Sequence, residues 1–156
     1  YLVNDSLQDI LGNLILKTID FNGKVLFEKT ILTEVKANSS QIVYTFSKKD
    51  IPKKYRKKSV VQLQFVTKEK KVNTTFYWVK PKDLQLLKPD LKITKIDEVT
   101  YEITSNVVAK NVCLSSDEKT HFSHNYFDVL PNEVYTIKVT QPVKTVSVKS
   151  LFDTLN

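Results

Sequence analysis

The sequence is poor in glycine, cysteine and histidine, and it has no methionine. Only two glycines are present, Gly12 and Gly23, and their separation excludes a glycine-rich loop that cradles phosphate. The single cysteine, Cys113, excludes a disulfide within the chain, and its apolar neighbours predict a buried thiol. No run of about 18 apolar residues occurs, which excludes a transmembrane helix.

The missing methionine and the first residue, Tyr1, predict that this chain is a fragment or processed piece of a longer protein, starting inside a strand. Of its 156 residues, 41% are hydrophobic, which is enough to form the core of one ordinary domain or two small ones. The net charge of +7 comes mainly from lysine. It is compatible with nucleic-acid or anionic-membrane binding and equally with a lysine-rich genome.

Short β-branched and aromatic segments separated by turns predict an all-β fold. The expected strands are 13–20, 24–35, 41–46, 60–67, 72–79, 91–96, 100–105, 112–115, 135–140 and 145–150. Asn22-Gly23 predicts a hairpin with a type I′ turn, in which both central residues have positive φ. A second short turn is expected at Glu69-Lys70-Lys71. Strands of this length and spacing favour a sandwich or barrel over βαβ units, and no helix is predicted.

Two prolines, Pro81 and Pro89, mark a break in the strand pattern, because proline donates no ladder hydrogen bond. We therefore predict two tandem immunoglobulin- or fibronectin-like β-sandwich domains, 1–80 and 89–156, joined by a linker at 81–88. The linker leucines are expected to be buried; they are Leu84, Leu86 and Leu87. The second domain is small enough to depend on its neighbour for stability.

Both histidines lie in the segment HFSHNYFDVLPNEVYTIKV, which spans 121–139. His121, His124 and Asp128 are candidate metal ligands, but a zinc site needs three or four ligands, and the chain has no further histidine. The favoured interpretation is a loop in which Asn125 and Asp128 bond the backbone. A third interpretation is that this loop faces an upstream domain.

Two aromatic residues of this segment, Phe122 and Phe127, are expected in the core. Further along, Leu130-Pro131-Asn132-Glu133-Val134-Tyr135 is typical of a tyrosine corner, in which the ring is buried and the hydroxyl bonds the backbone upstream. Serine, histidine and acidic residues also occur near 115–128, but without the GxSxG sequence of a nucleophile elbow. A structural role is therefore favoured over a catalytic triad.

The stretch FSHNYFDVLPNEVYTIKV resembles the last domain of glycoside hydrolase family 2 β-mannosidases, and the earlier sequence is similar to the preceding immunoglobulin-like domain of that family. The matching positions in the first stretch are Phe122, Ser123, Asn125, Tyr126, Phe127, Asp128, Leu130, Pro131 and Glu133. The other matching stretches are Val3-Asn4-Asp5, Ile19-Asp20-Phe21-Asn22-Gly23-Lys24-Val25-Leu26 and Val148-Lys149-Ser150-Leu151. Asn132 stands where the family usually has glycine, and we expect it to tolerate positive φ. His124 departs from the family pattern, so no chemical role is carried over to it.

The resemblance implies that catalysis resides in two glutamates on a (β/α)8 barrel upstream of this chain. Retaining glycosidases hold two carboxyl groups about 5 Å apart. The adjacent pairs Asp97-Glu98 and Asp117-Glu118 do not offer this arrangement, because neighbouring side chains on a strand point to opposite faces. No catalytic, cofactor-binding or metal-binding residue is therefore assigned, and no cofactor is expected. The resemblance also favours a periplasmic, secreted or lysosomal protein.

Two further segments suggest binding surfaces. Lys48 to Lys58, KKDIPKKYRKK, has seven basic residues and one acid, which suits phosphates or an anionic surface. A solvated loop is the favoured interpretation, because Tyr55 alone is a weak base-stacking platform. In Phe76-Tyr77-Trp78, alternation sends Phe76 and Trp78 to one face. They suggest a sugar-stacking platform, although a core position is favoured for the tryptophan.

These observations predict a non-catalytic C-terminal part of a β-mannosidase-like glycoside hydrolase, which packs on and supports the catalytic barrel. Two alternatives remain open: a carbohydrate-binding module for mannan-type glycans, and a fibronectin-like protein-interaction module. Expected partners are the upstream barrel of the same polypeptide and a glycan, without nucleic acid or membrane insertion.

Overall fold

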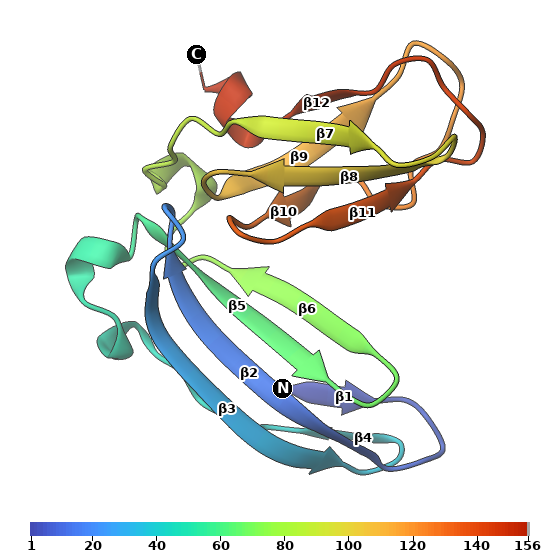
Figure 1. Cartoon of the computed structure of the whole chain (residues 1–156). Coiled ribbons are helices and arrows are strands. Elements are labelled where there is room, and N and C mark those ends of the chain that lie inside the picture. Colours follow the sequence, from blue (N-terminus) through green and yellow to red (C-terminus); the bar gives the residue numbers. More distant parts are fainter. Residues whose placement is uncertain (156) are drawn as a thin grey trace. The chain divides into compact units, whose positions relative to one another are not determined.

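The computed structural model describes residues 1–155, which form two compact units. Unit 1 comprises Tyr1–Asp20 and Lys24–Leu84, and unit 2 comprises Phe21–Gly23 and Gln85–Asn156. Strands and four short 3-10 helices account for the regular structure of the described residues, which include no α-helix (Figure 1). The prediction of an all-β chain with two sandwich domains is confirmed. No helix in the described range is long and apolar enough to cross a membrane.

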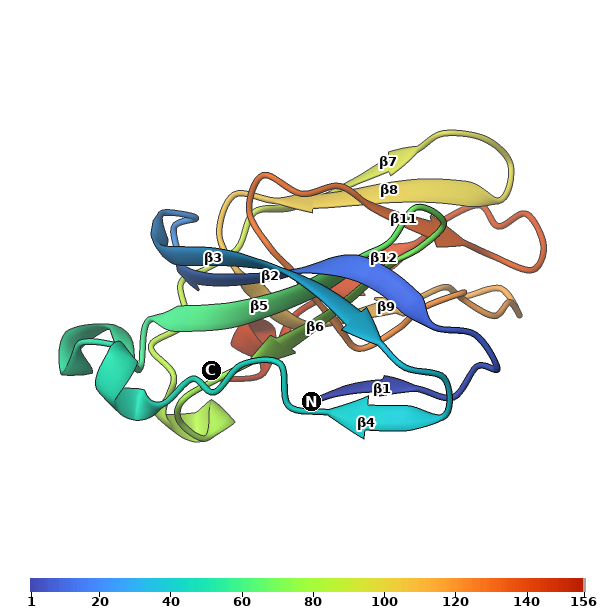
Figure 2. The same ribbon diagram turned by 90° about the horizontal axis from the view of Figure 1, so that it is seen from below.

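Unit 1 has a four-stranded antiparallel sheet of order β3-β2-β5-β6 and a separate pair, β1-β4. The strands are β1 (Leu2–Asn4), β2 (Ile10–Asp20), β3 (Val25–Val35), β4 (Ser39–Gln41), β5 (Ser59–Val66) and β6 (Lys71–Phe76). Figure 2 shows β1 and β4 side by side, apart from the larger sheet. Three 3-10 helices complete the unit: η1 (Lys48–Asp50), η2 (Lys53–Tyr55) and η3 (Pro81–Asp83).

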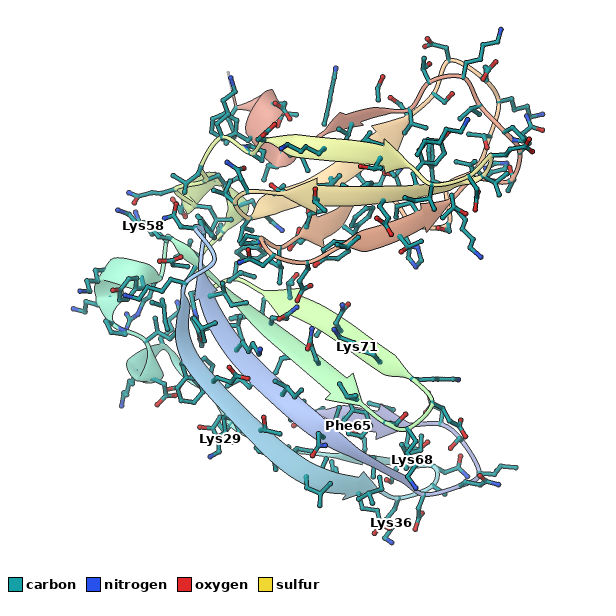
Figure 3. All side chains as sticks on the ribbon, viewed as in Figure 1. Lys29, Lys36, Lys58, Phe65, Lys68 and Lys71 are labelled. Atoms are coloured by element: carbon teal, nitrogen blue, oxygen red, sulfur yellow. The ribbon has the colours of Figure 1, made fainter. Side chains whose placement is uncertain are left out.

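The core of unit 1 follows the period-two alternation of its strands. Leu16 on β2 and Val61 on β5 are buried with Ile51 and Trp78 in one cluster. Phe27, Tyr44, Phe46, Tyr55, Leu63 and Val79 pack around it. Elsewhere in the sheet, the Phe65 ring lies over Gly12 (Figure 3), where an added Cβ would come within 2.8 Å of the ring. Gly12 therefore provides the space that this ring occupies.

The first hairpin forms as predicted, but its turn is not type I′. Gly23 has φ of +93°, whereas Asn22 is absent from the residues with positive φ. The pairing shifts between Thr18 and Ile19, and the Asp20 amide donates to the Lys24 carbonyl at 2.9 Å. This is a three-residue loop with one left-handed glycine. The Asp20 carboxylate stabilises it by accepting the Lys24 amide at 2.9 Å.

The predicted strand 41–46 is wrong, because β4 ends at Gln41. The following aromatic residues contribute packing instead of ladder hydrogen bonds: Phe46 stacks on Phe27 at 5.5 Å between ring centroids and meets Trp78 at 5.3 Å. The turn expected at 69–71 lies slightly earlier, since the Thr67 amide donates to the Lys70 carbonyl at 2.9 Å. The other predicted strands form, with boundaries shifted by up to three residues.

Unit 2 is a sandwich of two three-stranded antiparallel sheets, β11-β8-β7 and β10-β9-β12. Its strands are β7 (Leu91–Lys95), β8 (Thr100–Ser105), β9 (Ala109–Ser115), β10 (Phe127–Val129), β11 (Tyr135–Lys138) and β12 (Ser147–Lys149), followed by the 3-10 helix η4 (Leu151–Thr154). The sequence patterns did not predict β10. Phe21 also belongs to this unit, where it is buried and accepts the Val108 amide at 2.9 Å.

Alternation fixes which side chains of unit 2 are buried. Ile103 and Ile137 alternate with polar residues and face the core, together with Val112, Leu114 and Val129. Cys113 lies between two of these core positions, so its side chain points to the other face. It is half-buried, and the prediction of a buried thiol is wrong. In the expected linker Leu84 is buried, but Leu87 is 38% exposed, against expectation.

Candidate functional site

The two histidines of the segment His121–Asp128, which we call the histidine loop, do not converge on a common point. His121 uses its backbone, donating to the Thr140 hydroxyl at 3.1 Å and accepting the Thr140 amide at 3.1 Å. The exposed His124 ring contacts the Ser123 hydroxyl at 3.1 Å. Within residues 1–155, no three histidine, cysteine or acidic side chains gather as metal ligands would. The Asp128 carboxylate instead accepts a backbone amide of strand β9.

Asn125 holds the histidine loop against strand β9. Its Oδ1 accepts the Leu114 amide at 2.8 Å, and its Nδ2 donates to the Leu114 carbonyl at 3.0 Å. One side chain therefore satisfies both polar backbone groups of a buried core residue, as a neighbouring strand would. The expectation that Asn125 bonds the backbone is confirmed.

Asp128 has a similar role three residues earlier on β9, at Asn111. Its Oδ1 accepts the Asn111 amide at 2.9 Å and lies 3.7 Å from the Lys110 ammonium. The exposed fractions of the Lys110 and Asp128 side chains are 13% and 7%, so this ion pair is largely shielded from water. Asn111 has φ of +50°, a strained conformation for which the bond to Asp128 compensates. The prediction for Asp128 is also confirmed.

The tyrosine corner forms at Tyr135. The Leu130 amide donates to the tyrosine hydroxyl at 3.4 Å, and this hydroxyl donates to the Glu133 carboxylate at 2.8 Å. Burial of the hydroxyl, followed by the nearby Glu133 charge, raises the pKa of Tyr135 above its ordinary value. The ring stacks on Phe127 at 5.7 Å between centroids. Asn132 has φ of +64°, which confirms that asparagine takes the place of the usual glycine.

Tyr126 is the feature of this loop that sequence reasoning missed. It has φ of +59° and is 70% exposed, an uncommon combination for an aromatic residue. A hydrogen bond with the Cys113 thiol raises the pKa of the Tyr126 hydroxyl. The only available signal was its position directly after Asn125, whose anchored side chain also accepts the Tyr126 amide at 3.1 Å.

The aromatic pair of unit 1 does not form an open platform. Phe76 and Trp78 lie on one side, as predicted, with an edge-to-face contact at 5.1 Å between centroids. Trp78 is buried, which confirms the core interpretation, whereas Phe76 is 50% exposed. Trp78 is therefore covered and offers no face on which a sugar ring can stack.

One carboxylate of each adjacent acid pair accepts a backbone amide. The Asp97 carboxylate accepts the Val99 amide at 2.9 Å, and this bond lowers the pKa of Asp97. Glu118 accepts the Lys144 amide at 2.6 Å. Both carboxylates accept backbone amides: Asp97 within its own turn, and Glu118 from a residue 26 positions further along the chain.

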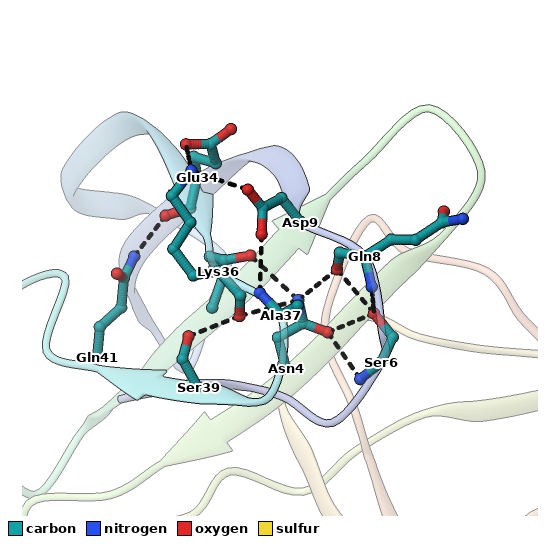
Figure 4. Close-up of polar contacts among 10 residues, drawn as sticks. Asn4, Ser6, Gln8, Asp9, Glu34, Lys36, Ala37, Ser39 and Gln41 are labelled. Carbon is teal, nitrogen blue, oxygen red and sulfur yellow. Dashed lines mark hydrogen bonds and ion pairs between the residues drawn. The ribbon is translucent and has the colours of Figure 1, made fainter.

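The start of the chain is held by a polar network around Asn4 (Figure 4). The buried Asn4 Nδ2 donates to the carbonyls of Gln8, Val35 and Lys36, at 2.8, 3.1 and 3.2 Å. Its Oδ1 accepts the Ser6 amide and hydroxyl. Lys36 bridges the carboxylates of Asp9 and Glu34 at 2.8 and 2.7 Å. The hydrogen bond from Lys36 is the main cause of a lowered pKa at Asp9.

Comparison with known protein families identifies the family of this chain. Residues 1–83 match the family described as Mannosidase Ig/CBM-like domain, and residues 86–154 match a second family, described as Ig-fold domain. The chain belongs to the mannosidase Ig/CBM-like domain family. The resemblance to the C-terminal immunoglobulin-like domains of family 2 β-mannosidases is thereby confirmed. No curated protein sequence matches the chain.

Solved structures agree with this fold. The β-D-mannosidase from Dictyoglomus thermophilum is similar over 96% of this chain, with a TM-score of 0.77 and 22% sequence identity. The exo-chitosanase CsxA from Amycolatopsis orientalis is similar over 95%, with a TM-score of 0.60 and 12% identity. This chain covers only 19% and 24% of those two chains. At such identities the likeness establishes the fold alone.

Proposed function

We propose that this chain is the non-catalytic C-terminal part of a β-mannosidase-like glycoside hydrolase, where it packs on and stabilises an upstream catalytic (β/α)8 barrel. The observation that carries the proposal is the tandem family match over residues 1–83 and 86–154. The polar side chains of the histidine loop support it, because Asn125 and Asp128 are bonded to the backbone of β9.

Exposed apolar side chains on unit 1 supply a surface for such packing. Leu11 on β2 and Leu32 on β3 are 60% and 68% exposed. In the β2–β3 register Leu32 lies opposite Asn13, so it shares one face of the sheet with Leu11. Apolar side chains grouped on a surface mark contacts with other protein more often than isolated ones do. We assign this face to the barrel contact.

The test compares the full-length protein with a truncation that ends before Tyr1, using hydrolysis of an aryl β-mannoside. The full-length double variant Leu11→Glu, Leu32→Glu is expected to inactivate faster on heating while its KM is unchanged, because the substitutions weaken packing and leave the barrel site intact. The matched control is Leu155→Glu, an exposed leucine of unit 2.

Hydrolysis of the aryl β-mannoside by the isolated chain would refute the proposal. So would an upstream sequence that encodes further sandwiches without a barrel. A truncation as active and as heat-resistant as the full-length enzyme would remove the supporting role.

A further inference from the structure

The segment Ser47–Lys58, which we call the basic loop, concentrates positive charge on one protrusion of unit 1. It carries η1 and η2, which project beyond the edge of the sheet in both views (Figures 1 and 2). Six of its seven basic side chains belong to exposed lysines. They are Lys48, Lys49, Lys53, Lys54, Lys57 and Lys58. Figure 3 shows Lys58 far from Lys68 and Lys71, which lie toward the opposite end of the sheet.

The charge of the basic loop is not neutralised from within. Its single acid, Asp50, completes a capping box by accepting the Ser47 amide at 2.6 Å. None of the six lysines forms an ion pair within the described chain. The contrast is Lys36, whose ammonium is shared by two carboxylates. The basic loop therefore presents a local excess of positive charge that attracts a polyanion.

The backbone that carries these lysines is already ordered. Ile51 is buried and anchors the loop in the core cluster. The Arg56 guanidinium donates to the carbonyls of Ile51, at 3.3 Å, and Lys48. The Ser59 hydroxyl donates to the Tyr55 carbonyl at 2.8 Å. A partner therefore binds a loop whose backbone is already ordered, so binding carries little entropic cost of ordering that backbone.

The geometry of the basic loop selects the kind of partner. Adjacent side chains on a 3-10 helix diverge by about 120°. The two lysines of η1 therefore point in different directions, and so do the two lysines of η2. A flat bilayer would meet only some of them, whereas a linear polymer can follow them. The Arg56 guanidinium is occupied by backbone carbonyls of the loop, so it offers no fork to an anion, and binding depends on the lysine ammonium groups. Tyr55 is half-buried with the Lys54 ammonium 4.9 Å from its ring, so bases have no stacking surface.

We propose that the basic loop binds a linear acidic polysaccharide through its carboxylate or sulfate groups. This binding is independent of the catalytic assembly proposed above, and it adds a polymer-holding surface to unit 1. Because lysine is a compact point charge on a flexible stem, the interaction is electrostatic and sensitive to salt, with little dependence on the sugar sequence.

Affinity electrophoresis tests the proposal with two probes, polygalacturonate for carboxylates and dextran sulfate for sulfates, at about 50 mM salt. Neutral dextran is the blank. The loop variant is Lys53→Gln, Lys54→Gln, Lys57→Gln. The control variant is Lys68→Gln, Lys70→Gln, Lys82→Gln, which removes three exposed lysines from other turns of unit 1. Both variants lower the net charge from +7 by the same three units.

We expect retardation of the chain by at least one acidic polymer, a loss of affinity of about tenfold or more in the loop variant, and a change below about twofold in the control. The polymer that retards identifies the anionic group. Equal losses in both variants would show an effect of net charge alone and overturn the proposal. Absence of retardation by either polymer would do the same. Tighter binding to phosphatidylserine vesicles or to oligothymidine, compared at equal concentrations of charge, would assign the loop to membrane or nucleic acid instead.

Discussion

The basic loop and the histidine loop both carry side chains that suggest chemistry, but they use those side chains in opposite ways. In the histidine loop, Asn125 and Asp128 are occupied with amides of β9. In the basic loop, Ser47, Asp50 and Arg56 satisfy the backbone, and the lysines extend into solvent. A polar side chain is available to a partner only when the loop's own backbone does not need it. The difference predicts which substitutions damage the fold and which damage binding.

The largest effect is expected for Asp128→Ala. It removes the acceptor of the Asn111 amide and leaves the shielded Lys110 ammonium without this carboxylate, so unit 2 should lose about 3 kcal/mol of stability. Hydrogen exchange of the β9 amides in increasing urea measures the loss. Asp128→Asn is the control, because its amide oxygen can still accept from Asn111. If both variants matched the wild-type protein, Asp128 would not anchor this loop.

A smaller effect is expected for Asn125→Ala, which removes the hydrogen-bond partner of both the Leu114 amide and the Leu114 carbonyl. The cost should be about 1 to 2 kcal/mol, with faster exchange concentrated at the Leu114 amide. His124→Ala is the matched change in the same loop and should alter stability by less than about 0.5 kcal/mol, since that ring is exposed. Equal effects of the two substitutions would argue against the clamp.

In the basic loop, Asp50→Ala should open η1 locally at a cost of about 1 kcal/mol, because the capping box is lost. The same change removes the loop's only negative charge, so affinity for an acidic polymer should rise even as exchange of the Lys49 amide accelerates. Asp83→Ala, which removes an exposed acid from η3, provides the comparison. Weaker polymer binding in Asp50→Ala would mean that order of the loop matters more than its charge.

The smallest effect on the fold is expected for the loop variant Lys53→Gln, Lys54→Gln, Lys57→Gln. Exposed lysines without ion pairs contribute little to folding, so stability should change by less than about 0.5 kcal/mol. Trp78 is the only tryptophan and is buried in unit 1, so its fluorescence in urea reports this unit. A loss above 1 kcal/mol would indicate that these lysines stabilise the loop itself.

Period-two alternation and turn chemistry carried most of the fold prediction. Tyr101, Ile103, Ile137 and Val139 alternate with polar residues in the sequence, and all four are buried. The roles of Asn125, Asp128 and Tyr135 were also predictable, because short polar side chains and a tyrosine after a proline-led turn have few other uses in a sandwich.

The errors arose where tertiary packing overrides local pattern. The segment 41–46 has the composition of a strand, yet its Phe46 ring packs against Phe27 and Trp78, and its backbone leaves the ladder. Asn22-Gly23 has the sequence of a type I′ turn, but the Asp20 carboxylate stabilises a longer loop. The positive φ of Tyr126 carries no signature in composition, because it follows from anchoring of the preceding Asn125.

The open edges of the four-stranded sheet bear on solubility. β3 and β6 are its outer strands, and exposed edges invite pairing with another chain. Charged side chains interrupt β3 at Glu28, Lys29 and Glu34, whereas β6 exposes Val72 and Phe76 and has a single charge, Lys71, at its first residue. Edge-to-edge aggregation of a concentrated sample should therefore begin at β6, with Lys71 as its main gatekeeper.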